Sequence, residues 1–284
     1  MLPGFFSGQE MQALHADFEA IFGKPAEHFA AATASAEEKN IGGGFHTAQF
    51  KNFKNLPFHC SPALNLLAVH PRLIALAQEA LDSSEILLYQ GQAWAKYSGE
   101  TDYTQPFHCD FGNHTLTVPA EHETRNSITF IILVSDVSEA HGPTHYVPKS
   151  LSDPIADITA SLSNGPELTA SLLPHSRSTA APAGALFAYG IDVFHRATNL
   201  TAPQGYRYVM TSCFKRADNS QIGYMAWPFH SHQPWQHIFN HATPEQLSCF
   251  GVPLPGDSYW TEQTLHQTSI RWPDWDSSAW RAAL

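Results

Sequence analysis

The stretch Gln105-Pro106-Phe107-His108-Cys109-Asp110-Phe111-Gly112-Asn113-His114 organises the whole chain. His108 and Asp110 stand two residues apart just beyond a predicted strand, so a backbone that curls as it leaves the strand turns both side chains toward one metal ion. The third ligand must come from far along the chain, and His195 is the best candidate. Two imidazoles and one carboxylate form the facial set of non-heme Fe(II) oxygenases, which leaves three positions open.

A second His-x-Asp pattern, His15-Ala16-Asp17, shows that the setting decides what the pattern means. It lies in a predicted helix that begins at the capping box Ser7-Gly8-Gln9-Glu10. Residues two apart on a helix diverge by about 200°, so this pair cannot share a metal. The same pattern after a strand predicts a metal site, and inside a helix it predicts none.

The middle of the chain reads as a series of short strands separated by turns. The predicted strands cover residues 85–97, 127–134, 182–189 and 206–214. Many short strands with regular turn signals indicate a closed double sheet such as a jelly roll. We therefore expect a mainly β fold with flanking helices, in one domain over residues 1–284.

Three parts of this single domain are expected. The part before the sheets, residues 1–84, is predicted to be helical, with an N-cap at Ser61-Pro62 and a break at Pro71. The jelly-roll core spans about residues 85–216, and within it residues 151–178 are expected to be polar and mobile. The C-terminal extension, residues 217–284, is rich in tryptophan and is expected to be helix and loop packed on the core, with a helix starting at Thr243.

Composition excludes several classes of function. The 284-residue chain has a net charge of −11 and no basic cluster, which argues against nucleic acid and, more weakly, against a membrane surface as a partner. The four cysteines have no C-x-x-C spacing, so neither a disulfide framework nor a zinc ribbon is expected. No signal peptide and no apolar run long enough to cross a bilayer is evident. A cytoplasmic protein acting on a small molecule is expected, and nothing indicates its oligomeric state.

Arg207 adds a second element to the metal set. It lies on the predicted strand that follows His195. A guanidinium is a rigid bidentate fork for a carboxylate, which the ammonium of a lysine cannot match. If that strand returns beside the one that carries His195, a dicarboxylic 2-oxo acid can chelate iron at one end and meet Arg207 at the other.

These pieces together resemble the phytanoyl-CoA dioxygenase (PhyH-like) family of Fe(II)/2-oxoglutarate oxygenases. The matching segments are Pro106–Asp110, Gly142–Ser150 and His195–Asn199 with Arg207. The resemblance implies a double-stranded β-helix (jelly roll, cupin-like) that uses Fe(II), 2-oxoglutarate and O₂. The Gly142–Ser150 segment departs from the usual Pro-Gly-Ser-His ending of the family.

The resemblance also implies roles for individual residues. His108, Asp110 and His195 would bind iron, and Arg207 would bind the distal carboxylate of 2-oxoglutarate. Two further contacts with the cosubstrate are carried over to the flanking strands, at Ser127 and Gln92.

The expected reaction is hydroxylation of a C–H bond of a small molecule, with succinate and CO₂ as co-products, because Asp110 is present where halogenating members have a small residue. Two alternatives stay open: a zinc hydrolase using the same triad, and a metal-binding jelly-roll protein without oxygenase activity. The sequence does not identify the substrate. Cys109 is expected to face away from the metal, since adjacent residues on extended chain point to opposite sides.

Overall fold

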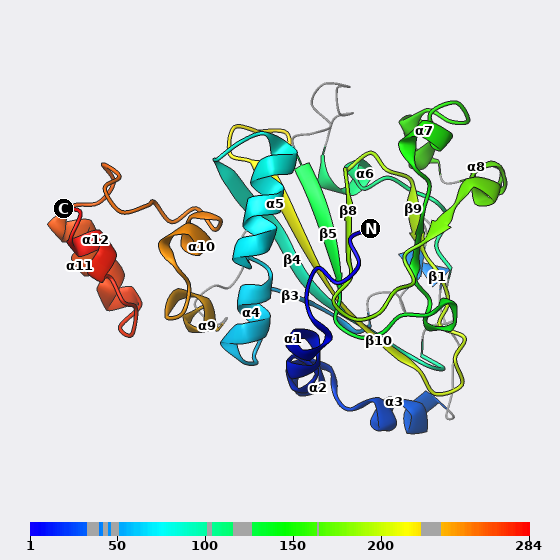
Figure 1. The fold of residues 1–284 in the computed structure, drawn as a ribbon, viewed down its shortest axis with the longest axis horizontal. Helices are drawn as coiled ribbons and strands as arrows, with labels where there is room; N and C mark the ends of the chain where they lie inside the picture. Colours follow the sequence, from blue (N-terminus) through cyan, green and yellow to red (C-terminus); the bar gives the residue numbers. More distant parts are fainter. Residues whose placement is uncertain are drawn as a thin grey trace.

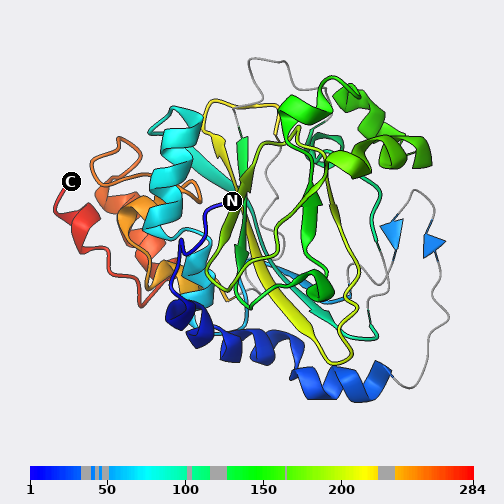
Figure 2. The ribbon, with the colours of Figure 1, turned by 45° about the vertical axis from the view of Figure 1, so that its right-hand side comes forward.

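The computed structural model describes residues 1–32, 40–41, 45–46, 51–100, 104–115, 127–163, 165–222 and 234–284. Its centre is a pair of antiparallel sheets, one five-stranded and one three-stranded (Figures 1 and 2). In spatial order the larger sheet holds β3 (Phe53–Asn55), β4 (Ile86–Tyr97), β10 (Tyr206–Arg216), β5 (Ser127–Leu133) and β8 (Leu186–Tyr189). The smaller holds β7 (Arg177–Ser178), β6 (Thr144–Tyr146) and β9 (His195–Ala197). A separate pair consists of β1 (Asn40–Ile41) and β2 (Phe45–His46).

The two faces of the larger sheet have different roles. On β5 and β10 the even-numbered apolar side chains, such as Phe130, Ile132 and Met210, belong to the main hydrophobic core. The odd-numbered ones line a cavity, because successive residues of a strand point to opposite faces. Pairing of β10 with both β4 and β5 aligns these odd positions along its length. One face of the sheet therefore serves packing, and the other serves the cavity.

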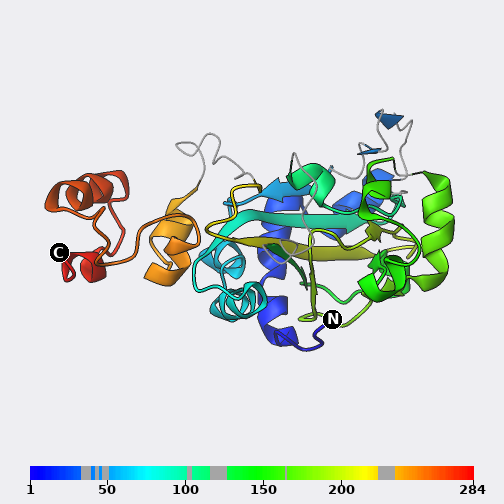
Figure 3. The same ribbon diagram turned by 90° about the horizontal axis from the view of Figure 1, so that it is seen from above.

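Helices from the N-terminal part pack on the apolar face (Figure 3). They are α1 (Gly8–Ala13), α2 (His15–Phe22), α3 (Pro25–Ala32), α4 (Pro62–Leu67) and α5 (Pro71–Leu81). The predicted capping box at Ser7, the N-cap at Ser61 and the break before Pro71 are all confirmed. His15 and Asp17 hold no common site: the imidazole bonds Val134 O, and the carboxylate accepts from Ser61.

The segment 151–178, predicted to be polar and mobile, is largely exposed, and it contains helices that the sequence analysis did not predict. Its described residues form short helices: α7 (Lys149–Ser152), η4 (Ile158–Leu162), α8 (Pro166–Leu172) and η5 (Leu173–His175). The Asp157 carboxylate caps η4 by accepting from Thr159 N. Leu172 and other apolar residues of this segment pack with Phe107 and Phe111 in a second core cluster. The polar composition of the segment gave no indication of these contacts, which pack it against the residues that flank the His-x-Asp pattern.

The C-terminal extension carries α9 (Gln236–Phe239), α10 (Pro244–Ser248), α11 (Glu262–Arg271) and α12 (Ser278–Arg281). The predicted helix start at Thr243 is confirmed by a capping box with Gln246. Trp235, Trp260 and Trp280 are buried in the same core cluster as α4 and α5, whereas Trp227 lies outside the described residues. Among the described helices, none combines the length and apolarity that a membrane span requires.

Candidate active site

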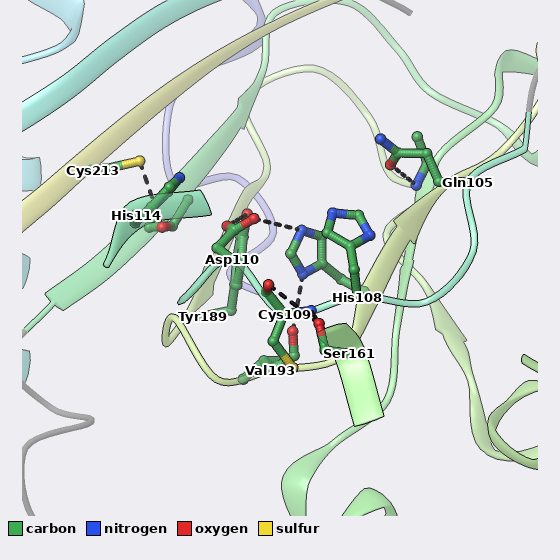
Figure 4. Close-up of polar contacts among 12 residues, drawn as sticks. Gln105, His108, Cys109, Asp110, His114, Ser161, Tyr189, Val193 and Cys213 are labelled. Atoms are coloured by element: carbon green, nitrogen blue, oxygen red, sulfur yellow. Dashed lines mark hydrogen bonds and ion pairs between the residues drawn. The ribbon is translucent and has the colours of Figure 1, made fainter. Parts of the chain in front are cut away.

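Strand pairing brings His108 and His195 together. The two residues exchange backbone hydrogen bonds, with N···O distances of 3.0 and 2.9 Å, so the His108 segment adds to the edge of β9. The backbone turns into the short helix α6 (Phe111–His114) at Asp110, which is the curl that the sequence predicts. One candidate ligand atom from each of His108, Asp110 and His195 lies within 4.8 Å of the other two, a grouping that could hold a metal ion (Figure 4).

Further hydrogen bonds hold each member of this triad. His108 Nδ1 donates to Pro106 O at 3.1 Å, and His195 Nδ1 donates to Val193 O at 2.9 Å. Each Nε2 is thereby left as the electron-pair donor to a metal. His195 Nε2 lies 3.4 Å from Asp110 Oδ1.

Burial and mutual charge set the ionisation of the triad. Burial, together with the charge of His195, lowers the pKa of His108 to about 4, so this imidazole is neutral at ordinary pH. Burial opposes ionisation of Asp110, but the charge and hydrogen bond of His195 outweigh it and lower the Asp110 pKa. For His195, burial is outweighed in turn by the Asp110 carboxylate, which raises the pKa. The raised His195 pKa favours the protonated ring only in the metal-free site, and a metal ion that binds there displaces this proton, which leaves a carboxylate and two imidazoles, the ligands that Fe(II) takes.

Cys109 faces away from the triad, as expected. Its side chain points away from the Asp110 carboxylate in Figure 4 and lies in the second core cluster, with the thiol donating to Asp192 O. Its backbone N donates to the buried Ser161 hydroxyl at 2.7 Å. The helices of the 151–178 segment therefore hold the backbone between the two ligands of the His-x-Asp pattern.

A cavity of about 500 Å³ lies between the two sheets and contains the triad. Side chains from β4, β5 and β10 line one wall, and Thr144 and Ala197 from the smaller sheet line the opposite wall. The cavity therefore connects the triad with the polar face of the larger sheet.

One end of the cavity holds two buried cations, Lys96 and Arg207. They are 8% and 7% exposed and stand directly opposite each other in the β4–β10 register. Lys96 Nζ donates to Thr198 O at 2.8 Å, and Arg207 Nη1 donates to Gly142 O. Arg207 Nε is buried and makes no hydrogen bond within the described structure. Burial and the charge of Arg207 lower the pKa of Lys96, and burial lowers that of Arg207 to about 10.

Gln92 and Ser127 are placed very differently. Gln92 lines the cavity on β4, on the same face as Lys96, and donates to Asn55 Oδ1 at 3.2 Å. Ser127 pairs with Lys215, eight residues along β10 from Arg207, which is about 26 Å at 3.3 Å per residue. One small dicarboxylate cannot span that distance. By the same measure Gln92, which pairs with Thr211, lies four residues or about 13 Å from Arg207, so it lines the wall between the Arg207 end and Gln90, whereas Ser127 does not line the cavity.

The opposite end of the cavity is polar and uncharged among the described residues that line it, apart from the triad and the imidazole of His114. A β-bulge between Cys213 and Phe214 shifts the register of β4 there. The Tyr89 hydroxyl lies 3.1 Å from His114 Nδ1. Asn113 and His114, which directly follow the His-x-Asp pattern, both line this end.

Two residues of the site escaped the sequence analysis. Lys96 could have been predicted from the sequence, because it lies an even number of residues after Gln92 on the same strand. Alternate residues of a strand point to the same face, so both side chains face the cavity. Tyr189 has no such signal. Its hydroxyl donates to Asp110 Oδ2 at 3.0 Å, a contact between β8 and a loop 79 residues away in the chain.

Comparison with known proteins identifies relatives of the fold. The family model for phytanoyl-CoA dioxygenase (PhyH) matches residues 1–207. The non-heme alpha ketoglutarate dependent epimerase SnoN from nogalamycin biosynthesis has a TM-score of 0.54 at 18% identity, covering 76% of this chain and 77% of that one. HygX from Streptomyces hygroscopicus, solved with nickel and 2-oxoglutarate, has a TM-score of 0.53 at 15% identity, covering 78% and 83%. No curated protein matches the chain.

Proposed function

The chain belongs to the phytanoyl-CoA dioxygenase family, and we propose that it is an Fe(II)- and 2-oxoglutarate-dependent dioxygenase. It hydroxylates a C–H bond of a small-molecule substrate and releases succinate and CO₂. The observation that carries this proposal is the placement of the buried cations Lys96 and Arg207 in the same cavity as the His108–Asp110–His195 triad. A metal set alone fits several chemistries, but a metal set that shares its cavity with a buried guanidinium and a buried amine fits a chelating dicarboxylate.

The donor set fits ferrous iron. It contains two imidazoles whose Nδ1 atoms donate to backbone carbonyls and leave Nε2 for the metal, one carboxylate, and no thiolate, because Cys109 is turned away. His108, Asp110 and His195 would hold the ion. When bound, iron supplies the activation of O₂ that a protein side chain cannot perform.

The cation end fits the distal carboxylate of 2-oxoglutarate. The buried Arg207 Nε lacks a partner in the described structure, and a buried donor without an acceptor is unfavourable. An incoming carboxylate satisfies it and neutralises the repulsion between Arg207 and Lys96. Gln92 lies on the same wall and is assigned to a polar contact with the cosubstrate.

The substrate is proposed to occupy the end of the cavity near Tyr89, Gln90 and His114. Gln90 Oε1 accepts from the Cys213 thiol at 3.2 Å, so the amide nitrogen of Gln90 is left to donate. Structures of related fold have been solved with nogalamycin RO, for SnoN, and with hygromycin B, for HygX. These support a small molecule as substrate. The proposal also includes a double-stranded β-helix as the architecture of the paired sheets, and one domain over residues 1–284, because buried tryptophans of the C-terminal extension share the core cluster of α4 and α5.

Anaerobic titration with Fe(II) and then 2-oxoglutarate tests the proposal. We expect a visible charge-transfer absorption band from the chelated cosubstrate, and succinate when O₂ is admitted. His108→Ala abolishes the band. If folded wild-type protein gives neither the band nor succinate, the proposal is contradicted, and the alternative of a metal-binding protein without oxygenase activity stands. If the protein instead catalyses hydrolysis with Zn²⁺, and this activity does not depend on Arg207, the zinc hydrolase is indicated. If succinate forms together with an epimerised product, the dependence on Fe(II) and 2-oxoglutarate stands, and only the proposed reaction, hydroxylation, is replaced.

A further inference from the structure

Each side chain of the triad has two polar atoms, one that would bind the metal and a second that makes a hydrogen bond to another residue. For His108 and His195, the second atom is Nδ1, and the acceptor is a backbone carbonyl. For Asp110 the second atom is Oδ2, and its partner is the side chain of Tyr189. Asp110 is thus the only member of the triad whose second contact is a side chain and can be removed by mutation without moving the backbone.

The structure holds the Tyr189 hydroxyl firmly in place. Tyr189 pairs with Thr129 in the register of β8 and β5. Its ring lies between two others, stacked on Phe187 at a centroid distance of 4.9 Å and tilted against His195 at 4.7 Å. The hydroxyl donates to Asp110 Oδ2, because an ionised carboxylate can only accept a hydrogen bond.

The two oxygens of Asp110 consequently face different partners. Oδ2 accepts from Tyr189 at 3.0 Å, whereas Oδ1 lies 3.4 Å from His195 Nε2, the atom that would also bind the metal. An oxygen engaged with a phenol is a poorer metal ligand than a free one. A carboxylate held in this way presents one oxygen to the ion instead of two.

We infer that Tyr189 is a positioning residue that makes Asp110 a one-oxygen ligand, and so determines both the metal affinity of the site and the number of coordination positions left for cosubstrate and O₂. The inference rests on the proposed function only in requiring that the triad binds a metal. Groups that orient metal ligands commonly contribute 10–100-fold to metal affinity. A carboxylate free to bind through both oxygens would occupy one of the three positions that the facial arrangement leaves open.

Tyr189→Phe removes the hydroxyl and keeps the ring stack, so it isolates this contact. The matched control is Tyr89→Phe, which removes a second buried phenol whose partner is His114 and not a triad member. We measure Co(II) affinity of the full-length proteins by titration, the intensity of the visible Co(II) absorption as a report of coordination, and the melting temperature without metal. The Co(II) signals respond to the ligand set, and a purely structural role of the hydroxyl does not change them.

We expect the Tyr189→Phe variant to show an altered Co(II) absorption spectrum, because Asp110 can then bind through both oxygens, and a Co(II) affinity changed about 10-fold or more in either direction, whereas Tyr89→Phe stays within about two-fold of wild type. Equal Co(II) affinities and spectra for wild type and Tyr189→Phe overturn the inference and leave the proposed function standing. Wild-type protein that binds neither Co(II) nor Fe(II) overturns both. A lower melting temperature with unchanged Co(II) binding assigns Tyr189 to packing and also overturns it.

Discussion

Replacement of Lys96 by Met is expected to make the free protein more stable and its binding of 2-oxoglutarate weaker. Lys96 and Arg207 are buried and directly opposite on β4 and β10. Opposed residues have Cβ atoms about 5 Å apart, so we take the charges to be roughly 6 Å apart. At an effective dielectric constant of about 20 they repel by about 3 kcal/mol. Loss of the Lys96–Thr198 hydrogen bond offsets about 1.5 kcal/mol of this.

The net stabilisation of the Lys96→Met variant is therefore about 1.5 kcal/mol, or roughly 3–6 °C in melting temperature. The pH dependence has a definite sign. The pKa of Lys96 is lower in the folded state than in the unfolded chain, so the unfolded chain binds more protons between the two values, and wild-type stability rises with pH there. The advantage of the variant is largest below the folded pKa and shrinks as pH rises toward about 10.4, the unfolded value.

Binding of the cosubstrate changes in the opposite direction. A hydrogen bond to a charged group contributes about 1.5–3 kcal/mol, so its loss weakens 2-oxoglutarate binding roughly 10–100-fold. Thermal melting of the free protein and anaerobic titration with Fe(II) and 2-oxoglutarate measure the two effects separately.

Lys215→Met on the neighbouring strand β10 is the matched control. Lys215 is also buried, and its Nζ donates to Asn219 O and Ile222 O at 2.8 and 2.7 Å, but it does not line the cavity. Its loss leaves two carbonyls without this donor, so this variant should be less stable by about 1–3 kcal/mol and bind 2-oxoglutarate normally. If Lys96→Met behaves like the control in both measurements, the assignment of the buried cation pair to a carboxylate is refuted.

Two further substitutions probe the same end of the cavity. Gly142→Ala should lower the melting temperature, because Gly142 has φ of +66° and an added Cβ would lie 2.6 Å from Thr198 O. The expected loss in the free energy of unfolding is at least about 1–3 kcal/mol, and an unchanged melting temperature would contradict it. The same variant should bind 2-oxoglutarate more weakly, because the Gly142 carbonyl accepts a hydrogen bond from Arg207. Ser127→Ala should leave 2-oxoglutarate affinity within about two-fold of wild type in the same titration, since the serine lies far from Arg207, and a ten-fold loss would show that the cosubstrate binds elsewhere.

Local signals were sufficient for much of the fold. The capping boxes at Ser7 and Thr243 and the break before Pro71 depend on contacts within one turn, and all three were predictable. Strand positions followed from apolar, β-branched runs such as residues 127–134. The short helices of the 151–178 segment were not predicted, because its apolar residues are stabilised by contact with Phe107 and Phe111 and carry no periodic pattern of their own.

For the site, the sequence by itself determined which residue types could form a metal set and a carboxylate anchor: His108, Asp110, His195 and Arg207. Only the tertiary structure decided what stands beside them. The pairing of β4 with β10 sets Lys96 opposite Arg207, and the pairing of β8 with β5 aims Tyr189 at Asp110. The physical reason is that the face of a strand on which a residue lies is a local property with period two, whereas the register between strands depends on distant packing. A residue's neighbour across the sheet therefore cannot be deduced from its own segment.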